Sequence, residues 1–329
     1  MNFKKLALAA VIGATMATTA IAQEATFWRI GTGGAGGTYF PIGGLIANAI
    51  SNPPGSRSCE DGGTCGVEGL VAIAVSTNAS VANMNAVHSG QLDAGLAGGL
   101  AVADGFAGTG KFVGNARFKV RAIAALYPED LHLVLAKGLE LKSLTDLNGL
   151  RVGVGAAGSG TQVSVRSLLA AFGIEADESE LNLGQSRDRL ADEQIDAFFY
   201  GGGWPFAALI QLGSNKGFDL YSFSPEEIKI ITDTVPTYVE STIPASAYET
   251  ISYDVKTLAS TASFVTSVDQ KEELIYEITK ALWSDKTKSL LQKGHAKGKQ
   301  IILENALKGV TIPLHPGAER FYREQGMIK

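Results

Sequence analysis

Two glycine-rich segments of the chain combine the residue types and the spacing of an anion-binding loop. Gly31–Thr38 (GTGGAGGT) and Gly155–Thr161 (GAAGSGT) each follow a strand pattern and precede a helix pattern. At such a junction, backbone N–H groups and the positive end of the following helix can hold a negatively charged group. A third polar segment, Ser76–Ser80, follows the strand pattern of Val71–Val75. We therefore expect the ends of three strands to carry the chemistry of this protein.

The first glycine segment also contains the G-x-G-x-x-G spacing of dinucleotide-binding proteins, at Gly31, Gly33 and Gly36. That signature needs an acidic residue about 20 residues further on, at the end of a second strand. The corresponding stretch, Ser51–Gly55, has neither an acid nor a strand pattern. The sequence therefore argues against NAD, and a purely structural glycine turn is the remaining alternative to an anion site.

The second glycine segment has a P-loop spacing between Gly155 and Gly160. However, Thr161 stands where the phosphate-binding lysine of that motif belongs. ATP binding is therefore not expected, and the segment is predicted to hold an anion through amides and hydroxyls.

The polar segment after Val75 has a simpler alternative role, which is to cap a helix. Ser80 alone would satisfy that requirement. Because Ser76, Thr77 and Asn78 exceed what capping needs, we favour a polar binding surface.

Signatures of catalysis or of metal binding are weak in this sequence. The chain has no G-x-S-x-G or H-E-x-x-H motif, and its four histidines occur in unrelated contexts. We expect no enzyme activity, no metal and no cofactor. A periplasmic enzyme stays as a rival hypothesis, which turnover of a bound metabolite would reveal.

The rest of the chain predicts the elements that position these loops. Strand-like and helix-like stretches alternate, which is typical of an α/β fold with a largely parallel sheet covered by helices. The clearest helix is Thr161–Phe172, with Gly173 at its expected C-terminal cap. A chain of 329 residues exceeds one ordinary core and fits two domains of about 150 residues each.

A crossing between the two domains is expected near Tyr127–Asp130. This segment, with its proline and two acids, separates the apolar runs Arg121–Leu126 and Leu131–Ala136. The chain shows no low-complexity linker, so we expect strands rather than a flexible tether to join the domains.

The N-terminus has the pattern of a secretory signal peptide. Lys4-Lys5 precede the apolar run Leu6–Ala14, and Ala20-Ile21-Ala22 supplies small residues at the positions that a signal peptidase recognises. A membrane anchor is the alternative, but this run is shorter than the ~20 residues that span a bilayer. The sequence predicts cleavage after Ala22 and a periplasmic location.

The overall charge restricts the partners of the protein. The net charge is −5 at neutral pH, and the loss of two signal-peptide lysines would make it more negative. An acidic surface argues against nucleic acid and anionic membranes as partners. An anionic solute must therefore be held by local donors.

Cys59 and Cys65 are the only cysteines, and they flank a Gly-Gly turn. In an oxidising compartment such a pair most simply forms a disulfide. A metal site would need further ligands, and the histidines are far away in the sequence, so we expect a disulfide and no metal.

Five motifs, in their order and spacing, resemble the TAXI branch of the solute receptors of TRAP transporters. The motifs are Gly31–Gly44, Ser76–Asn83, Gly90–Gly95, Val154–Thr161 and His315–Ala318. The resemblance implies two α/β domains of the type II periplasmic-binding-protein kind, which close over a solute in the cleft between them. The expected boundaries are 1–22 for the signal peptide, 23–126 plus about 258–329 for domain I, and 127–257 for domain II.

The resemblance also implies a function. It implies a monomeric receptor that captures a small anionic solute, a carboxylate such as glutamate or 2-oxoglutarate, and delivers it to sodium-driven TRAP membrane subunits. The alternatives are a periplasmic sensor of the same fold and a receptor for a neutral or other amino acid.

The ligand-binding residues implied by the resemblance come from both domains and from the crossing. They are Gly34, Thr38, Tyr39, Ser76, Thr77, Asn78 and Ser80 of domain I, Tyr127 at the crossing, and Ser159, Gly160, Thr161 and Trp204 of domain II.

One departure from the family pattern affects the expected ligand. The family usually has two glycines where this chain has Asn78-Ala79, which should shrink the pocket or add an amide contact. The three loops contain no Arg or Lys, so neutral donors would hold the anion. Arg187 and Arg189 are candidates for a cation, but a surface position beside neighbouring acids is the preferred interpretation.

Overall fold

The computed structural model describes residues 24–329, so the expected signal peptide lies outside the described residues. Ten strands form one mixed sheet, and two short strands pair separately. The strands are β1 (Thr26–Gly31), β2 (Ser51–Asn52), β3 (Val67–Glu68), β4 (Leu70–Val75), β5 (Ala94–Gly98), β6 (Val120–Leu135), β7 (Arg151–Gly153), β8 (Asp177–Ser179), β9 (Ala197–Gly202), β10 (Asp219–Leu220), β11 (Val239–Ile243) and β12 (Val255–Ser267).

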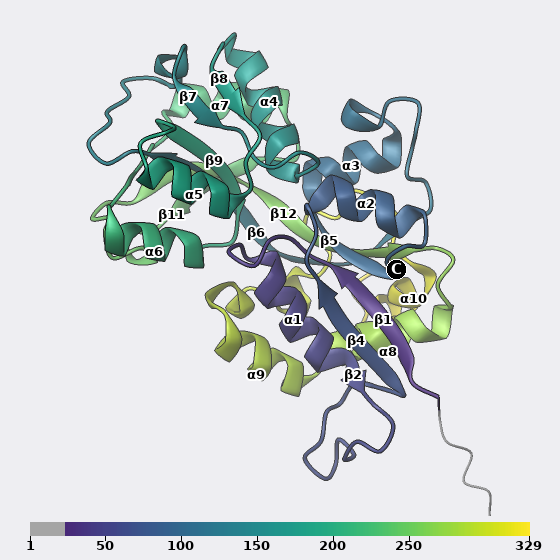
Figure 1. The fold of residues 1–329 in the computed structure, drawn as a ribbon. Helices are drawn as coiled ribbons and strands as arrows, with labels where there is room; N and C mark the ends of the chain where they lie inside the picture. The colour runs from purple at the N-terminus through teal and green to yellow at the C-terminus, as the bar shows by residue number, and fades with distance from the viewer. Residues whose placement is uncertain (1–23) are drawn as a thin grey trace, which may run out of the picture.

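Helices cover both ends of this sheet (Figure 1). They are α1 (Tyr39–Ile50), α2 (Ser80–His88), α3 (Gly99–Ala107), α4 (Gly160–Phe172), α5 (Leu183–Ala191), α6 (Ala207–Asn215), α7 (Pro225–Thr234), α8 (Glu272–Leu282), α9 (Asp285–Gly294) and α10 (Pro316–Glu324). None of the helices within residues 24–329 combines the length and the apolar character needed to cross a bilayer.

The sheet changes its character from its ends to its centre. The main strand order is β4-β1-β5-β12-β6-β9-β7-β8. Strand β1 lies parallel to β4 and β5, and β7 lies parallel to β8 and β9. Between these parallel groups, β12 and β6 run antiparallel to each other and to their outer neighbours. The two longest strands therefore connect two smaller parallel sheets.

The apolar core is divided in the same way. Two clusters consist of buried residues from 28–127 and 262–322, and two others consist of residues from 131–258. We call these sets the first and the second core group. Both β6 and β12 pass from one group to the other, as Figure 1 shows near its centre. The domain boundaries at 126/127 and 257/258 stay a prediction.

The expected crossing is built from one continuous strand. The apolar runs on either side of Tyr127–Asp130 both belong to β6. The segment stays extended because it pairs with Ala259–Ala262 of β12. A register irregularity follows at Ala262/Ser263, which pair with Tyr127 and Ala125 and leave Leu126 without a partner in β12.

Local capping explains why α4 forms where the sequence predicts it. The Ser159 hydroxyl accepts a hydrogen bond from the Gln162 N–H at 3.1 Å, and Gly173 ends the helix with a φ of 60°. A serine at the N-cap and a glycine at C′ satisfy backbone groups that the helix leaves unpaired. The helix predicted for 161–172 therefore runs from 160 to 172.

The predicted cap of α2 was wrong. Ser80 is the first residue of that helix, and the N-cap position belongs to Ala79, which has a φ of 65°. The Ser80 hydroxyl instead accepts a hydrogen bond from the Gly98 N–H at 3.0 Å. Ser80 therefore joins the start of α2 to the end of β5.

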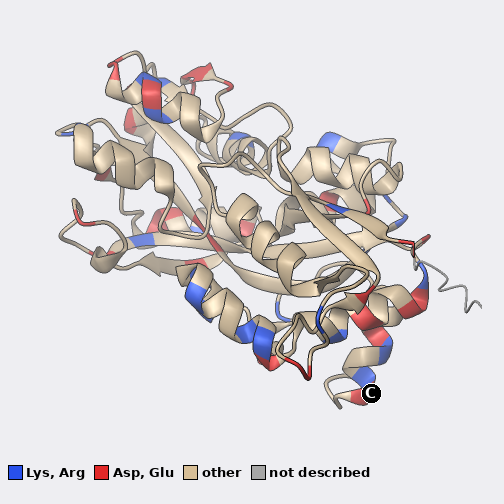
Figure 2. Ribbon diagram, turned by 60° about the horizontal axis from the view of Figure 1, so that its bottom comes forward, with Lys and Arg blue, Asp and Glu red and all other residues tan. Residues whose placement is uncertain are grey.

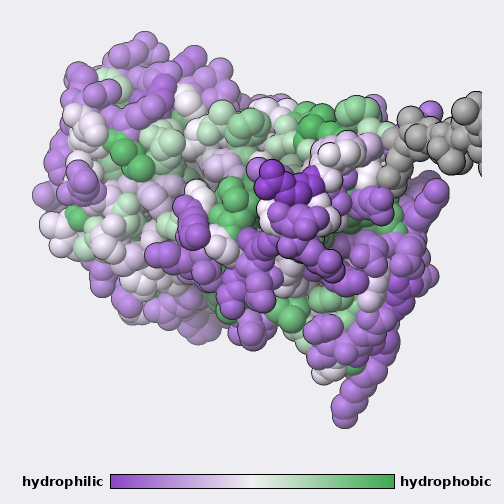
Figure 3. Space-filling model, turned by 90° about the horizontal axis from the view of Figure 1, so that it is seen from below, coloured by the Kyte–Doolittle hydropathy of each residue, from purple (hydrophilic) through white to green (hydrophobic). Residues whose placement is uncertain are grey.

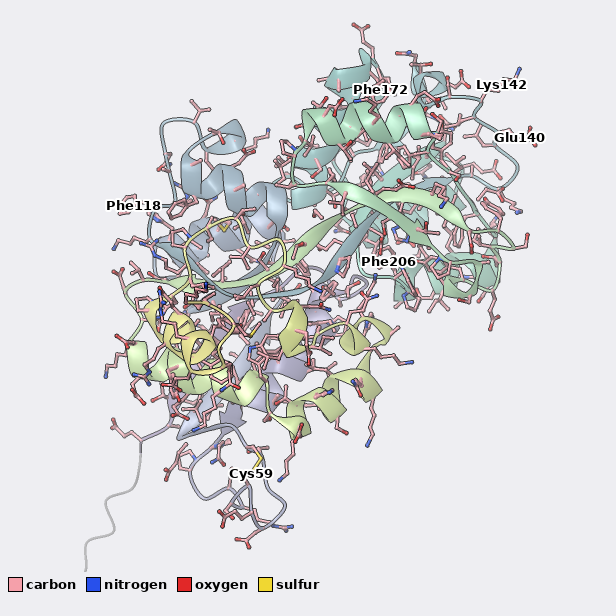
Figure 4. All side chains as sticks on the ribbon, turned by 180° about the vertical axis from the view of Figure 1, so that it is seen from behind. Cys59, Phe118, Glu140, Lys142, Phe172 and Phe206 are labelled. Atoms are coloured by element: carbon pink, nitrogen blue, oxygen red, sulfur yellow. A yellow bond between two sulfur atoms is a disulfide. The ribbon has the colours of Figure 1, made fainter. Side chains whose placement is uncertain are left out.

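Cys59 and Cys65 form the expected disulfide, in the loop between β2 and β3 (Figure 4). The Lys286 ammonium of α9 donates to the Cys59 carbonyl at 2.6 Å and to the Gly63 carbonyl at 2.9 Å. The disulfide thus cross-links the loop, and the Lys286 hydrogen bonds attach it to α9.

Charged residues lie mostly on the outer helices and loops of the molecule (Figure 2). The face seen from below is largely hydrophilic, with hydrophobic residues in scattered patches (Figure 3). The few charged side chains that are buried, such as Glu129, Asp130 and Lys297, are therefore unusual in this molecule.

Candidate ligand-binding site

Two adjacent hollows lie where the first and second core groups meet. The smaller one, which we call the inner cavity, has a volume of about 60 Å³. The larger one, which we call the outer pocket, has a volume of about 330 Å³. They share the lining residues Ala79, Ser159, Thr161 and Tyr200, so they form neighbouring parts of one cleft.

The inner cavity is lined by loops and helix ends from both core groups. Its lining residues are Thr38, Tyr39, Ala79, Ser80, Gly98, Leu100, Ala101, Glu129, Ser159, Gly160, Thr161, Ser164, Tyr200, Gly201, Gly202, Tyr238 and Ser260. Apart from Glu129, these residues are hydroxyl-bearing, glycine or apolar, so the cavity carries little charge.

Four helices begin at the inner cavity. Helices α1, α2 and α3 start there from the first core group, and α4 starts there from the second. Each helix N-terminus favours a negative charge by ~0.3–1 kcal/mol when exposed, and by more when it is partly buried. The convergence of four such ends gives the cavity the electrostatic character of an anion site.

Several contacts join the two core groups around this cavity. The Thr38 hydroxyl of α1's N-cap donates to the Gly203 carbonyl. The Ala82 N–H of α2 donates to the Gly158 carbonyl at 3.3 Å. A Cβ atom at Gly160 would lie 2.6 Å from the Ser80 hydroxyl oxygen. The starts of α2 and α4 are therefore packed as closely as glycine allows.

Glu129 projects from β6 into the inner cavity and is 7% exposed. The pKa of this carboxyl is raised to about 8, mainly by burial and also by the neighbouring Asp130. The Tyr39 hydroxyl, which hydrogen-bonds to Glu129, and the Lys297 ammonium lower it. At neutral pH the carboxyl is therefore mostly protonated.

Ten of the expected site residues line these two hollows, seven of them as follows. Thr38, Tyr39, Ser80, Ser159, Gly160 and Thr161 line the inner cavity, and Gly34 lines the outer pocket. The Thr161 hydroxyl is partly engaged, since it accepts a hydrogen bond from the Gly201 N–H at 3.2 Å.

The polar segment after β4 lies at the outer pocket and also holds the loops together. Ser76, Thr77 and Asn78 all line this pocket. The Ser76 hydroxyl donates to the Gly33 carbonyl at 3.0 Å, and the Thr77 hydroxyl donates to the Thr32 carbonyl at 2.8 Å. Ser76 and Asn78 are both exposed, and Thr77 is half-buried.

Tyr127 and Trp204 do not line either hollow among the described residues. Tyr127 is 2% exposed, and a Cβ atom at Gly203 would lie 2.9 Å from its ring. The Lys297 ammonium lies 4.5 Å from the centre of the Trp204 ring. These two aromatic residues therefore lie outside both hollows.

The two candidate arginines lie on α5, away from both hollows. Arg187 pairs with Asp188 at 2.6 Å and also donates to Gln211, and Arg189 is exposed. The preferred interpretation as surface residues agrees with these positions.

Several lining residues had no recognisable signal in the sequence. Tyr200 and Tyr238 lie in or near apolar stretches, and Glu129 reads only as one of two acids beside a proline. An acid inside a strand that is otherwise buried was the one available clue. Its significance depends on which face of β6 it occupies.

Comparisons with solved structures identify the fold. An ancestral arginine-binding protein bound to arginine is 17% identical, with 83% of this chain and 98% of that chain covered and a TM-score of 0.51. A protein of Bordetella bronchiseptica RB50 is 16% identical, with coverages of 92% and 82% and a TM-score of 0.50.

These likenesses concern the fold, which is the mixed α/β fold of periplasmic solute-binding proteins with a type II-like arrangement. The sequence itself matches a family model over residues 30–326, which is nearly all of the described chain. The chain therefore belongs to the NMT1-like family.

Proposed function

We propose that the protein is an extracytoplasmic receptor that captures a small carboxylate in the inner cavity and delivers it to membrane subunits. The observation that carries this proposal is the convergence of four helix N-termini, from both core groups, on one buried cavity. A carboxylate placed there would accept hydrogen bonds from backbone amides and hydroxyls.

The fold supports a receptor because the hollow lies between two core groups that are joined by the strands β6 and β12. In two-domain proteins, bending of a few residues in such connections opens and closes a cleft around a ligand. The arginine-binding protein of similar fold was solved with its amino acid bound.

The proposed partners are the sodium-coupled membrane subunits of a TRAP transporter. This part of the proposal rests on the five sequence motifs that resemble TAXI receptors. Export by the N-terminal signal peptide would place the receptor beside those subunits, and the described residues contain no membrane-spanning helix. A sensor of the same fold would have the same cavity but would pass the signal to a kinase.

A thermal-shift screen tests the proposal. We expect glutamate, 2-oxoglutarate or fumarate to raise the melting temperature of the protein in a concentration-dependent way, because a ligand that binds only the folded state stabilises it. Neutral sugars serve as controls. Stabilisation by an uncharged solute, with none by any carboxylate, would contradict the proposal.

Transport is tested separately from binding. Proteoliposomes that contain the cognate membrane subunits should accumulate the identified solute only when the receptor and a sodium gradient are both present. Accumulation that needs ATP instead would point to a different class of importer.

A further inference from the structure

Glu129 is the one charged side chain among the described residues that line the inner cavity. It faces three tyrosines of the lining, Tyr39, Tyr200 and Tyr238, and burial raises the pKa of each of them. These phenols stay protonated at neutral pH. They can donate hydrogen bonds, but they cannot neutralise a cation.

The adjacent acid, Asp130, has a different environment. Successive side chains of a strand point to opposite faces, so Asp130 faces away from the cavity. It is 2.7 Å from the Lys297 ammonium and accepts a hydrogen bond from the Ser241 hydroxyl at 2.6 Å. Lys297 is therefore paired with Asp130, and within residues 24–329 no cationic side chain forms an ion pair with the Glu129 carboxyl.

The space beside the Glu129 carboxyl depends on a glycine. A Cβ atom at Gly98 would lie 2.8 Å from the Glu129 Oε2 atom. Gly98 is also the N-cap of α3, so the carboxyl lies next to a helix end that favours anions. A second anion bound at the same ends would repel an ionised Glu129 unless it carried a cation with it.

A solute that complements these two features carries a carboxylate for the helix ends and a cation for Glu129. We propose that Glu129 is the specificity-determining residue of the inner cavity, where its carboxylate binds the ammonium group of an amino acid. This inference rests on the proposed function and narrows its ligand from carboxylates in general to amino acids. Burying an acid without a cation is costly, and the ligand's ammonium group would supply the missing partner.

Calorimetric titration of matched ligand pairs tests this role. Each pair has the same carbon skeleton and differs only in an amino or an oxo group: glutamate and 2-oxoglutarate, aspartate and oxaloacetate, alanine and pyruvate. For the pair that contains the tightest ligand, we expect the amino acid to bind the wild-type protein at least tenfold more tightly than the oxo acid. In Glu129→Gln that preference should fall below threefold, through weaker binding of the amino acid alone.

A control variant accounts for the general loss of an acid. Glu140 is an exposed acid at the far end of the molecule from the disulfide loop (Figure 4). Glu140→Gln should therefore keep the wild-type preference.

A second measurement needs no variant. Because the pKa of Glu129 is about 8, its carboxyl is mostly protonated at pH 7, and an arriving ammonium group would displace that proton. The other groups around it are the three tyrosines, which stay protonated because burial raises their pKa values, and the ion pair of Asp130 and Lys297. Titrations in two buffers of different ionisation enthalpy should show the release of close to one proton per amino acid and none per oxo acid.

These experiments distinguish failure of the Glu129 role from failure of the proposed receptor function. Tighter binding of the oxo acid, equal weakening of both ligands by Glu129→Gln, or no proton release would overturn the role of Glu129 and leave the carboxylate receptor standing. If no carboxylate of either kind binds, the proposed function and this inference both fall.

Discussion

The backbone at Ala79 departs from what a side chain normally allows. Its φ is 65° and its ψ is −142°, in a region that costs a residue with a Cβ atom about 1–3 kcal/mol. Ala79 also lines both the inner cavity and the outer pocket. A glycine at this position would adopt the same turn without strain.

We therefore expect Ala79→Gly to increase the free energy of unfolding by about 1 kcal/mol, since relief of the strain exceeds the added entropy of the unfolded chain. Urea denaturation measures the change. Ala86→Gly, inside α2, is the control and should destabilise by about 1 kcal/mol. Equal destabilisation by both variants would show that position 79 is not strained.

The buried carboxyl of Glu129 should make stability depend on pH. Its pKa in the folded state, about 8, is above the value in an unfolded chain, so the folded state binds the proton more tightly. This contribution is fully present below about pH 4.5 and is lost as pH rises to about 8.

Urea denaturation at pH 6 and pH 8.5 checks this dependence. The wild type should lose more stability between these two values than Glu129→Gln, which has no proton to lose there. Parallel losses in the two proteins would mean that Glu129 already ionises at low pH.

At the scale of elements, the segment after α9 is tied to the centre of the sheet. Lys297 and Asp130 are 3% and 2% exposed and lie 2.7 Å apart. The removal of one partner of a buried pair leaves an uncompensated charge and typically costs about 3–5 kcal/mol.

Lys297→Met should therefore lower the free energy of unfolding by about 3 kcal/mol or more, and Lys297→Met combined with Asp130→Asn should recover part of that loss. The exposed pair Lys229–Asp233, also 2.7 Å apart, provides the control, because Lys229→Met should cost less than about 1 kcal/mol. Similar losses for the two lysine variants would contradict this account of the buried pair.

The elements were largely predictable because their signals are local. The helix after Gly155–Thr161 follows from a cap, a periodic apolar face and a terminal glycine, all within about 20 residues. Lys297 and Asp130 are 167 residues apart, and no local pattern pairs them. Ser80 was misread as a cap because the alternative partner, the Gly98 N–H, lies on another strand.

The candidate site was likewise predictable only where its residues belong to a local sequence pattern. The loops that combine glycines with hydroxyl residues were predictable from their composition. Six of their residues line the inner cavity. Glu129, Tyr200 and Tyr238 enter the cavity only because of the side of the sheet on which they lie and the way in which the core groups meet. Trp204 lines neither hollow, and its ring centre lies 4.5 Å from the Lys297 ammonium.

At the scale of the whole molecule, we expect the proposed closure of the cleft to depend on the near contact of α2 and α4. A Cβ atom at Gly160 would lie 2.6 Å from the Ser80 hydroxyl and 3.1 Å from its Cβ atom. We expect Gly160→Ala to keep the two helix ends apart and to weaken binding of the solute at least tenfold.

Small-angle X-ray scattering should then show a larger radius of gyration for Gly160→Ala than for the wild type at the same solute concentration. Gly44→Ala is a matched control, because a Cβ atom at Gly44 in α1 meets no atom within 4 Å. Wild-type affinity and dimensions in Gly160→Ala would show that the two helix ends are not critical for closure.

The small volume of the inner cavity has a kinetic consequence. About 60 Å³ holds only a few water molecules, so we expect a solute to enter or leave only while the two core groups are apart. The residence time of a bound solute is then limited by the opening rate of the protein, rather than by the strength of any single hydrogen bond. Contacts between the core groups, such as that between Ala82 and Gly158, should therefore lower the rate at which the solute dissociates, although they do not touch it.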